Sequence, residues 1–131
     1  MARVLLYNIQ NEEKEINIRL DSYRLGIQCQ SVAAEDFGAP VGYLLGLTGY
    51  ARGGECAERF TDEMLLMEDL RGGQLNAFLD ALRTARVPVA LKAVVTEHNV
   101  GWSSLRLHEE LKKEHAAMQT AARRSVHKKR K

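Results

Sequence analysis

Two short apolar runs constrain the fold of this chain more than any other feature. Residues 3–9 read RVLLYNI and residues 62–70 read DEMLLMEDL, and both hold consecutive apolar side chains. Successive side chains of a β-strand point to opposite faces of a sheet, so each run must be covered on both sides. We therefore predict two central strands in a sheet whose two faces are both buried.

The rest of the chain predicts alternating helices and strands. Asn11 suits a helix cap, and Ile16, Leu20 and Tyr23 recur at the spacing of one apolar helix face. Gly26 is a natural end for this helix. The further predicted elements are a half-exposed edge strand over residues 27–33, a loop with one or two helical turns over residues 35–58, an amphipathic helix over residues 75–86, a last strand over residues 89–96, and a closing helix capped by Asn99 or a nearby serine.

This order of elements predicts an α+β fold. A ferredoxin-like βαββαβ sheet of strand order 4-1-3-2, with an added C-terminal helix, puts both apolar runs at the centre. The loop region, the closing helix or a second subunit would then cover its second face. Alternatively, if residues 41–47 form a crossover helix, the chain becomes a four-strand parallel, three-layer α/β fold. We assign residues 1–119 to a single domain and residues 120–131 to a basic, disordered tail.

Composition narrows the classes of protein that fit. A chain of 131 residues with 45% hydrophobic and 27% charged residues can bury a core without a disulfide or a metal. Its apolar runs are too short to cross a membrane, and its start lacks the features of a signal peptide, so we expect a cytoplasmic protein. Cys29 and Cys56 form no Cys-x-x-Cys pair and fit a reducing compartment.

Basic residues gather at the C-terminus, where no acidic residue follows Glu114. Such a segment can hold phosphate backbones nonspecifically, with binding that weakens as salt rises. It can also be a solvated terminus, which we favour because no aromatic side chain is present to stack on bases. The candidate nucleic-acid-binding residues are Arg123, Arg124, Lys128, Lys129, Arg130 and Lys131.

The densest polar cluster of the chain follows the predicted last strand. It can form a small-ligand site with a general acid or base, or it can serve only capping and turn chemistry, which we favour. In a parallel sheet Asn8 would join the cluster, whereas in a ferredoxin-like sheet it would lie at the opposite end. The candidate ligand-binding residues are Lys92, Thr96, Glu97, His98, Asn99 and Trp102.

Motifs of known chemistry are missing from the sequence. His108 and His115 lie about 10 Å apart along one helix, too far for one metal ion, and we interpret both as solvated helix surface. The glycines of residues 46–54 carry no phosphate-loop signature, and no serine lies in a nucleophile motif. We therefore predict no catalytic residue, no metal ligand and no cofactor.

Several stretches of the sequence carry a resemblance to a known family. They are VLLYNI, EMLLMEDL, QLNAFLDALR, LKAVVTEHNVGW and LHEELKKEH, and they are densest from Glu63 to His115. On these stretches the chain resembles the domain-of-unknown-function family 3783, a family of small uncharacterised bacterial proteins. The resemblance implies a bacterial, cytosolic setting and carries no activity.

Three functions are compatible with these observations. The first is a non-catalytic regulatory or protein-interaction domain that can form a homodimer or bind an unknown protein partner. The second is a small-ligand sensor or enzyme that uses the polar cluster after the last strand. The third is nonspecific association with nucleic acid through the basic tail, which can accompany either of the others. We favour the first, because the sequence shows no convergent catalytic set.

Overall fold

The two apolar runs form the two central strands of a four-stranded sheet. The computed structural model describes residues 2–54 and 56–129, and for residues 119–129 it describes only the backbone. Helices and strands alternate through the chain, so the predicted α+β class is confirmed. The elements are β1 (Arg3–Tyr7), α1 (Glu12–Arg24), β2 (Gln28–Ser31), the 3-10 turn η1 (Ala34–Asp36), α2 (Val41–Leu44), β3 (Met64–Glu68), α3 (Gln74–Thr84), β4 (Leu91–Val94) and α4 (Ser104–Lys129).

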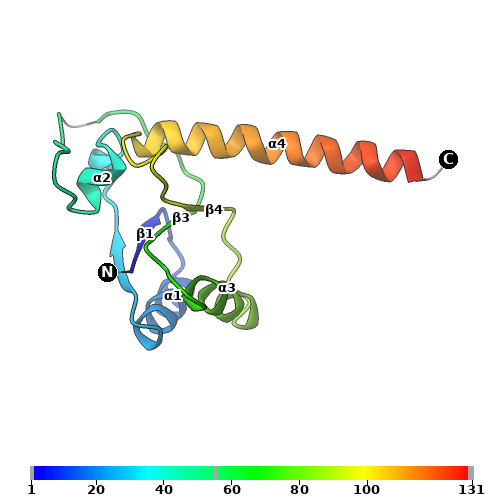
Figure 1. Cartoon of the computed structure of the whole chain (residues 1–131), viewed down its shortest axis with the longest axis horizontal. Helices are drawn as coiled ribbons and strands as arrows, with labels where there is room; N and C mark the ends of the chain where they lie inside the picture. Colours follow the sequence, from blue (N-terminus) through cyan, green and yellow to red (C-terminus); the bar gives the residue numbers. More distant parts are fainter. Residues whose placement is uncertain (1, 55, 130–131) are drawn as a thin grey trace.

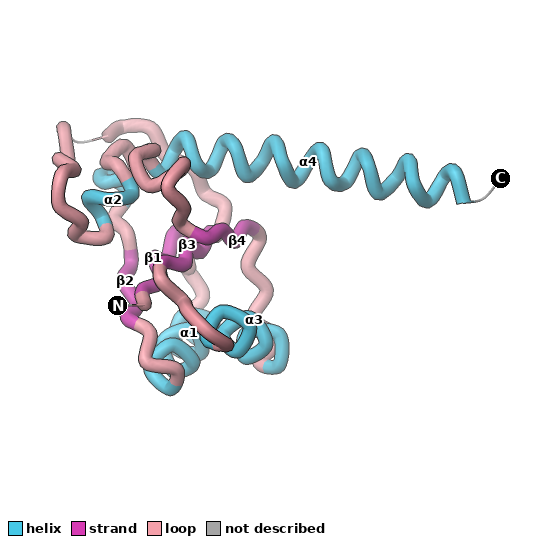
Figure 2. Tube along the Cα trace, viewed as in Figure 1, coloured by secondary structure: helices cyan, strands magenta, loops and turns pink. Residues whose placement is uncertain are grey.

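Two βαβ units make up the sheet. In the first unit α1 connects the parallel strands β1 and β2, and in the second α3 connects the parallel strands β3 and β4. The units join where β1 and β3 run antiparallel, with Leu5 opposite Leu66 in the middle of the pairing. The strand order is β2-β1-β3-β4 (Figure 2), which confirms that β1 and β3 are the central strands.

This strand order corrects both predicted topologies. A ferredoxin-like sheet of order 4-1-3-2 would place β3 between β1 and β2, and a parallel sheet would run β1 and β3 in the same direction. Here each βαβ unit keeps its own two strands adjacent, and the sheet is mixed. The long connection over residues 32–63 packs over one face of the sheet and leads to β3 on the side of β1 that β2 does not occupy.

Helices α1 and α3 cover one face of the sheet and lie side by side (Figure 1). Alternate residues of the central strands point toward them, as the period of two along a strand requires. Phe78 and Leu82 of α3 are buried one helical turn apart, so the amphipathic helix predicted over residues 75–86 is confirmed. The other principal side chains of this layer are Val4, Leu6, Ile18, Leu65 and Met67.

The opposite face is covered by the chain between β2 and β3 and by the start of α4. Phe37 and Phe60 of the connection stack with ring centroids 4.5 Å apart, and Tyr7 of β1 lies against both rings. Leu107 of α4 joins the same buried cluster. The predicted cover of the second face is therefore present, and it comes from both the loop region and the closing helix. The short helix α2 agrees with the one or two helical turns predicted there.

Helix α1 turns a different face to the sheet than its apolar spacing predicts. Asn11 caps the helix as predicted, because its side chain accepts the backbone N–H of Lys14 at 3.0 Å. The residues fully buried against the sheet are Ile18 and Ser22, and the Ser22 hydroxyl donates to the Ile18 carbonyl at 2.7 Å. The apolar face of residues 16, 20 and 23, which the spacing predicted, is present but is not the face that packs on the sheet. Those three side chains point to water.

Helix α4 leaves the body of the molecule after its first turns (Figure 1). The Ser103 hydroxyl accepts the backbone N–H of Arg106 at 3.1 Å, which confirms a serine cap for this helix. The backbone is helical through Lys129 and so extends into the segment assigned to the tail, while the division at residue 119 stays a prediction. Over the described residues, no helix combines the length and the apolar content that crossing a membrane requires.

Candidate functional site

The polar cluster after β4 folds into a turn held by its own side chains. The Thr96 backbone N–H donates to Oδ1 of Asn99 at 2.8 Å, and Nδ2 of Asn99 donates to the Val94 carbonyl at 3.1 Å. The Thr96 hydroxyl accepts the backbone N–H groups of His98 and Asn99 at 3.2 and 3.3 Å. Short polar side chains that bond to nearby backbone in this way favour turns over regular structure.

The hydrogen bonds of the turn account for the polar side chains of Thr96 and Asn99. Asn99 is only 9% exposed, and both ends of its amide are already hydrogen-bonded within the turn. Glu97 and His98 project into solvent from the tip of the turn. The arrangement ends β4 and directs the chain into α4, as capping and turn chemistry would.

A groove of about 390 Å³ runs between β4 and the first turns of α4. The fold brings five of the six predicted ligand residues to it, and Glu97 is not among its lining. The lining residues are Lys92, Ala93, Val94, Thr96, His98, Asn99, Trp102, Leu107, Glu110, Leu111 and Glu114. The Thr96 hydroxyl and the Asn99 amide in this lining are used to hold the turn. These two groups therefore offer a ligand little further hydrogen bonding.

Trp102 serves as a packing anchor within this groove. Its ring lies against the buried cluster of the second sheet face, and the Arg106 guanidinium carbon lies 4.3 Å from the ring centroid. A guanidinium over an indole is a favourable cation–π contact. The ring is therefore partly covered by the chain itself.

Asn8 lies at the other end of the sheet from this turn. Its side chain donates to the carbonyls of Phe60 and Asp62 at 2.8 and 3.0 Å and so ties the end of β1 to the approach of β3. Since β1 runs antiparallel to β3 and β4, its carboxyl end meets their amino ends. The joint site of Asn8 and Asn99 that a parallel sheet would form does not exist.

A second polar cluster joins α4 to the end of the long connection. His108 Nε2 lies 2.8 Å from Asp62 Oδ2, and the imidazole ring stacks on Phe60 with centroids 4.1 Å apart. The hydrogen bond from His108 lowers the pKa of Asp62, and Lys112, 3.5 Å from the same oxygen, acts in the same direction. The prediction of solvated helix surface is wrong for His108, whose side chain is 15% exposed.

No local signal in the sequence announces this cluster. His108 and Asp62 lie 46 positions apart, and only the path of the long connection brings them together. The geometry is that of a structural contact between α4 and the end of the long connection. It pairs the imidazole with one carboxylate, and no group of three potential metal ligands gathers anywhere among the residues that the structure describes.

The apolar stripe on α1, which the spacing in the sequence indicated, is exposed. Ile16, Leu20 and Tyr23 are 57%, 45% and 83% exposed, and they share one face of the helix. Exposed Glu13 and Arg24 border the stripe. A run of large apolar side chains on one exposed helix face is typical of a surface that meets another molecule.

The candidate nucleic-acid residues cannot be placed in the same detail. Arg130 and Lys131 lie outside the described residues, and the side chains of Arg123, Arg124, Lys128 and Lys129 lie outside the described side chains. Their association with phosphate backbones stays a prediction.

Comparison with known proteins gives one family and no activity. Residues 63–118, which span β3, α3, β4 and the first half of α4, match the family described as Domain of unknown function (DUF3783). No curated protein and no solved structure matches the chain. The matched segment contains four of the five stretches that carry the resemblance, and VLLYNI lies outside it. Residues 63–118, fewer than half of the chain, are therefore similar to the DUF3783 family.

Proposed function

We propose that this chain is a non-catalytic protein-interaction domain that pairs with a second copy of itself through α1. The observation that carries the proposal is the exposed stripe of Ile16, Leu20 and Tyr23. Removing each of these side chains from water would stabilise the complex by about 25 cal/mol per Å² of apolar area buried. The side of α1 that faces its own sheet is already complete with Ile18 and Ser22, so the stripe needs a cover from outside the chain.

The charges beside the stripe favour a second copy as that cover. Glu13 lies seven positions before Leu20 and Arg24 lies four positions after it, and these spacings put both charges on the Leu20 side of the stripe. In a two-fold pair of antiparallel helices, each flank of one helix lies beside the same flank of the other. A pair centred on Leu20 therefore sets Glu13 of each copy near Arg24 of the other, offset by about 4.5 Å along the axis.

The size of the stripe predicts a reversible dimer. Stable interfaces bury about 1,600 Å² in total, and three side chains on one helix contribute less than that. We therefore expect association that rises with protein concentration.

The Leu20→Glu substitution tests the proposal directly. It puts a charge at the centre of the apolar contact, and we expect the dimer dissociation constant to rise by about tenfold or more, because central apolar positions dominate such interfaces. Sedimentation equilibrium over a range of concentrations measures the constant. Met118→Glu is the matched control, since Met118 is 71% exposed on α4, and this variant should associate as the wild type does.

Charge reversal tests the register of the pair. Glu13→Arg and Arg24→Glu should each weaken association, because each creates two like-charge contacts, and the double variant should restore it. The proposal is wrong if the wild-type chain is monomeric at all accessible concentrations, or if the Leu20→Glu chain dimerises unchanged.

A further inference from the structure

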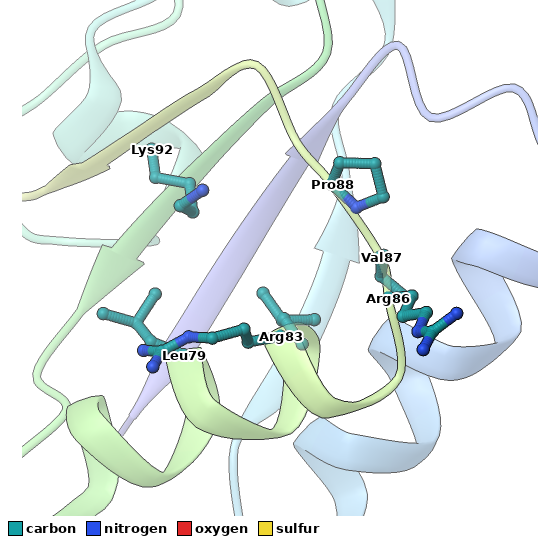
Figure 3. A pocket seen from close by; sticks show the side chains of 7 residues that line it. Leu79, Arg83, Arg86, Val87, Pro88 and Lys92 are labelled. Carbon is teal, nitrogen blue, oxygen red and sulfur yellow. The ribbon is translucent and has the colours of Figure 1, made fainter.

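A second cavity opens between α3 and β4, on the sheet face that α1 and α3 cover, and it shares Lys92 with the groove beside α4. Its volume is about 560 Å³, within the range of small-molecule sites. Leu79 and Leu82 of α3 and Val87 and Pro88 of the following connection supply its apolar wall (Figure 3). Leu82 and Val87 are only 4% and 7% exposed, so this wall is continuous with the packed core and keeps its shape.

Every charged side chain that lines this cavity is a cation. Arg83 comes from α3, Arg86 from the turn that follows it and Lys92 from β4, and none of the lining residues that the structure describes is acidic. Figure 3 shows Lys92 and Arg83 reaching toward the same opening from the strand and the helix, with Arg86 on the far side of the connection. Two cations thus face one apolar hollow from opposite walls.

These two cations have donors that a ligand can use. Arg83 Nη2 lies 3.0 Å from Asp80 Oδ1, but the side chains are 78% and 65% exposed, and an exposed ion pair of this kind is readily exchanged. Lys92 Nζ donates to the Val89 carbonyl at 3.3 Å, and an ammonium group has three donors. An oxyanion between the two walls can therefore accept from both side chains.

We propose that this cavity binds a small organic anion with an apolar body, whose carboxylate or phosphate head is held by Arg83 and Lys92. The apolar body would lie on Leu79 and Pro88, where it removes hydrocarbon from water. An inorganic anion uses only the cations of this site, and a neutral apolar molecule uses only the wall. The site therefore selects ligands that carry both parts.

Calorimetric titration of the full chain at low salt tests the proposal. The probes are octanoate and octyl phosphate, with octanol and inorganic phosphate as ligands that carry one part only. We expect one or both octyl anions to bind and to shift the amide resonances of Val87 and Lys92 in NMR spectra, and we expect the two single-part probes to bind at least about tenfold more weakly. Which of the two octyl anions binds more tightly distinguishes a carboxylate head from a phosphate head.

Substitutions locate the binding in this cavity. Arg83→Met and Lys92→Met retain an unbranched side chain and remove its charge. Each should raise the dissociation constant of the octyl anion by about tenfold. Arg71→Met is the matched control, since Arg71 is 86% exposed and does not line the cavity, and it should leave the affinity unchanged. The proposal fails if no octyl anion binds at millimolar concentration, if octanol binds as tightly as octanoate, or if both Met variants bind as the wild type does.

Discussion

A buried pair of hydroxyl groups joins the first strand to the last helix. Tyr7 Oη lies 2.7 Å from Ser104 Oγ, and both side chains are fully enclosed. Burial raises the pKa of the Tyr7 hydroxyl, so the phenol stays protonated and one of the two groups donates to the other. A buried hydroxyl that loses its partner keeps the full cost of leaving water, which makes this pair sensitive to single substitutions.

The Tyr7→Phe substitution should therefore lower the free energy of unfolding by about 1–2 kcal/mol, because it strands the Ser104 hydroxyl in an apolar layer. Ser104→Ala should have a similar effect. The double variant should cost less than the sum of the two, since no unpaired hydroxyl remains. Urea unfolding of the four chains measures the coupling. Simple additivity would show that the two groups do not depend on each other.

The contact of Asp62 with His108 makes part of the free energy of unfolding depend on pH in the acidic range. The hydrogen bond from His108 holds the pKa of Asp62 below its ordinary value of 3.8, so the folded state favours the charged carboxylate. A carboxyl group with a depressed pKa stabilises the fold fully above its unfolded pKa and loses that contribution as the pH falls through the folded pKa. Asp62→Asn should therefore destabilise the chain at about pH 5 and much less at about pH 2.

Urea unfolding at a series of acidic pH values measures this difference between the wild type and the variant. Asp80→Asn is the control, because Asp80 is 65% exposed in its pair with Arg83 and an exposed ion pair contributes little to stability. A gap between the wild type and Asp62→Asn that stays constant down to about pH 2 would contradict the expected loss of the carboxylate contribution.

Local chemistry was predictable at the residue scale, and distant pairing was not. The Asn11 cap, the serine cap of α4 and the turn at Thr96 and Asn99 all use groups within a few residues of each other, so sequence patterns identify them. His108 finds its partner across 46 positions, and the candidate ligand residues reach one groove only because β4 and α4 pack together.

At the scale of elements, the sequence predicted α1 and its apolar face, but that face is not the one that packs on the sheet. Ser22 can be buried because its hydroxyl is satisfied by the carbonyl of Ile18 one turn earlier, so a polar residue takes a core position. An apolar spacing indicates which side chains avoid water, and it does not say whether the same chain supplies the cover. The pairing order of the strands is non-local in the same way, since no short pattern determines which strand lies beside β1.

Close packing of α2 against Tyr50, later in the same connection, predicts a specific effect at Gly42. A Cβ atom added there would lie 2.5–2.8 Å from the ring atoms of Tyr50, closer than real Cβ contacts allow. Gly42→Ala should therefore lower the free energy of unfolding by about 1–3 kcal/mol, as overpacking does. Gly54→Ala is the matched control, since a Cβ there meets open space, and thermal unfolding compares the two. Equal stability of the two variants would mean that the Tyr50 ring moves aside at no cost.

At the scale of the whole molecule, the described side chains of α4 pack on the body only in the first turns of the helix. Leu107 is buried, Leu111 is partly buried, and the described side chains from 112 to 118 are exposed. The side chains of residues 112–118 therefore contribute little to the core.

A chain that ends after Met118 should consequently keep the unfolding midpoint of the full chain in urea. A chain that ends after Trp102 should unfold at a much lower urea concentration. The second sheet face would lose Leu107, and the Tyr7 hydroxyl would lose its partner Ser104. Circular dichroism during urea unfolding compares the three chains. A large loss of stability in the chain that ends after Met118 would show that the distal part of the helix packs on the body.

The symmetric junction of the two βαβ units has a consequence for how such a protein can be assembled. The family segment, residues 63–118, contains only the second unit, and in this chain its inner strand β3 pairs along one edge with β1. Because that pairing is antiparallel, a half-turn about an axis through the Leu5 and Leu66 pair carries β1 and β2 onto β3 and β4 in direction and order. Two separate half-length chains, each with one βαβ unit, could therefore build the same sheet by meeting edge to edge, so the architecture is open to both a fused and a split form.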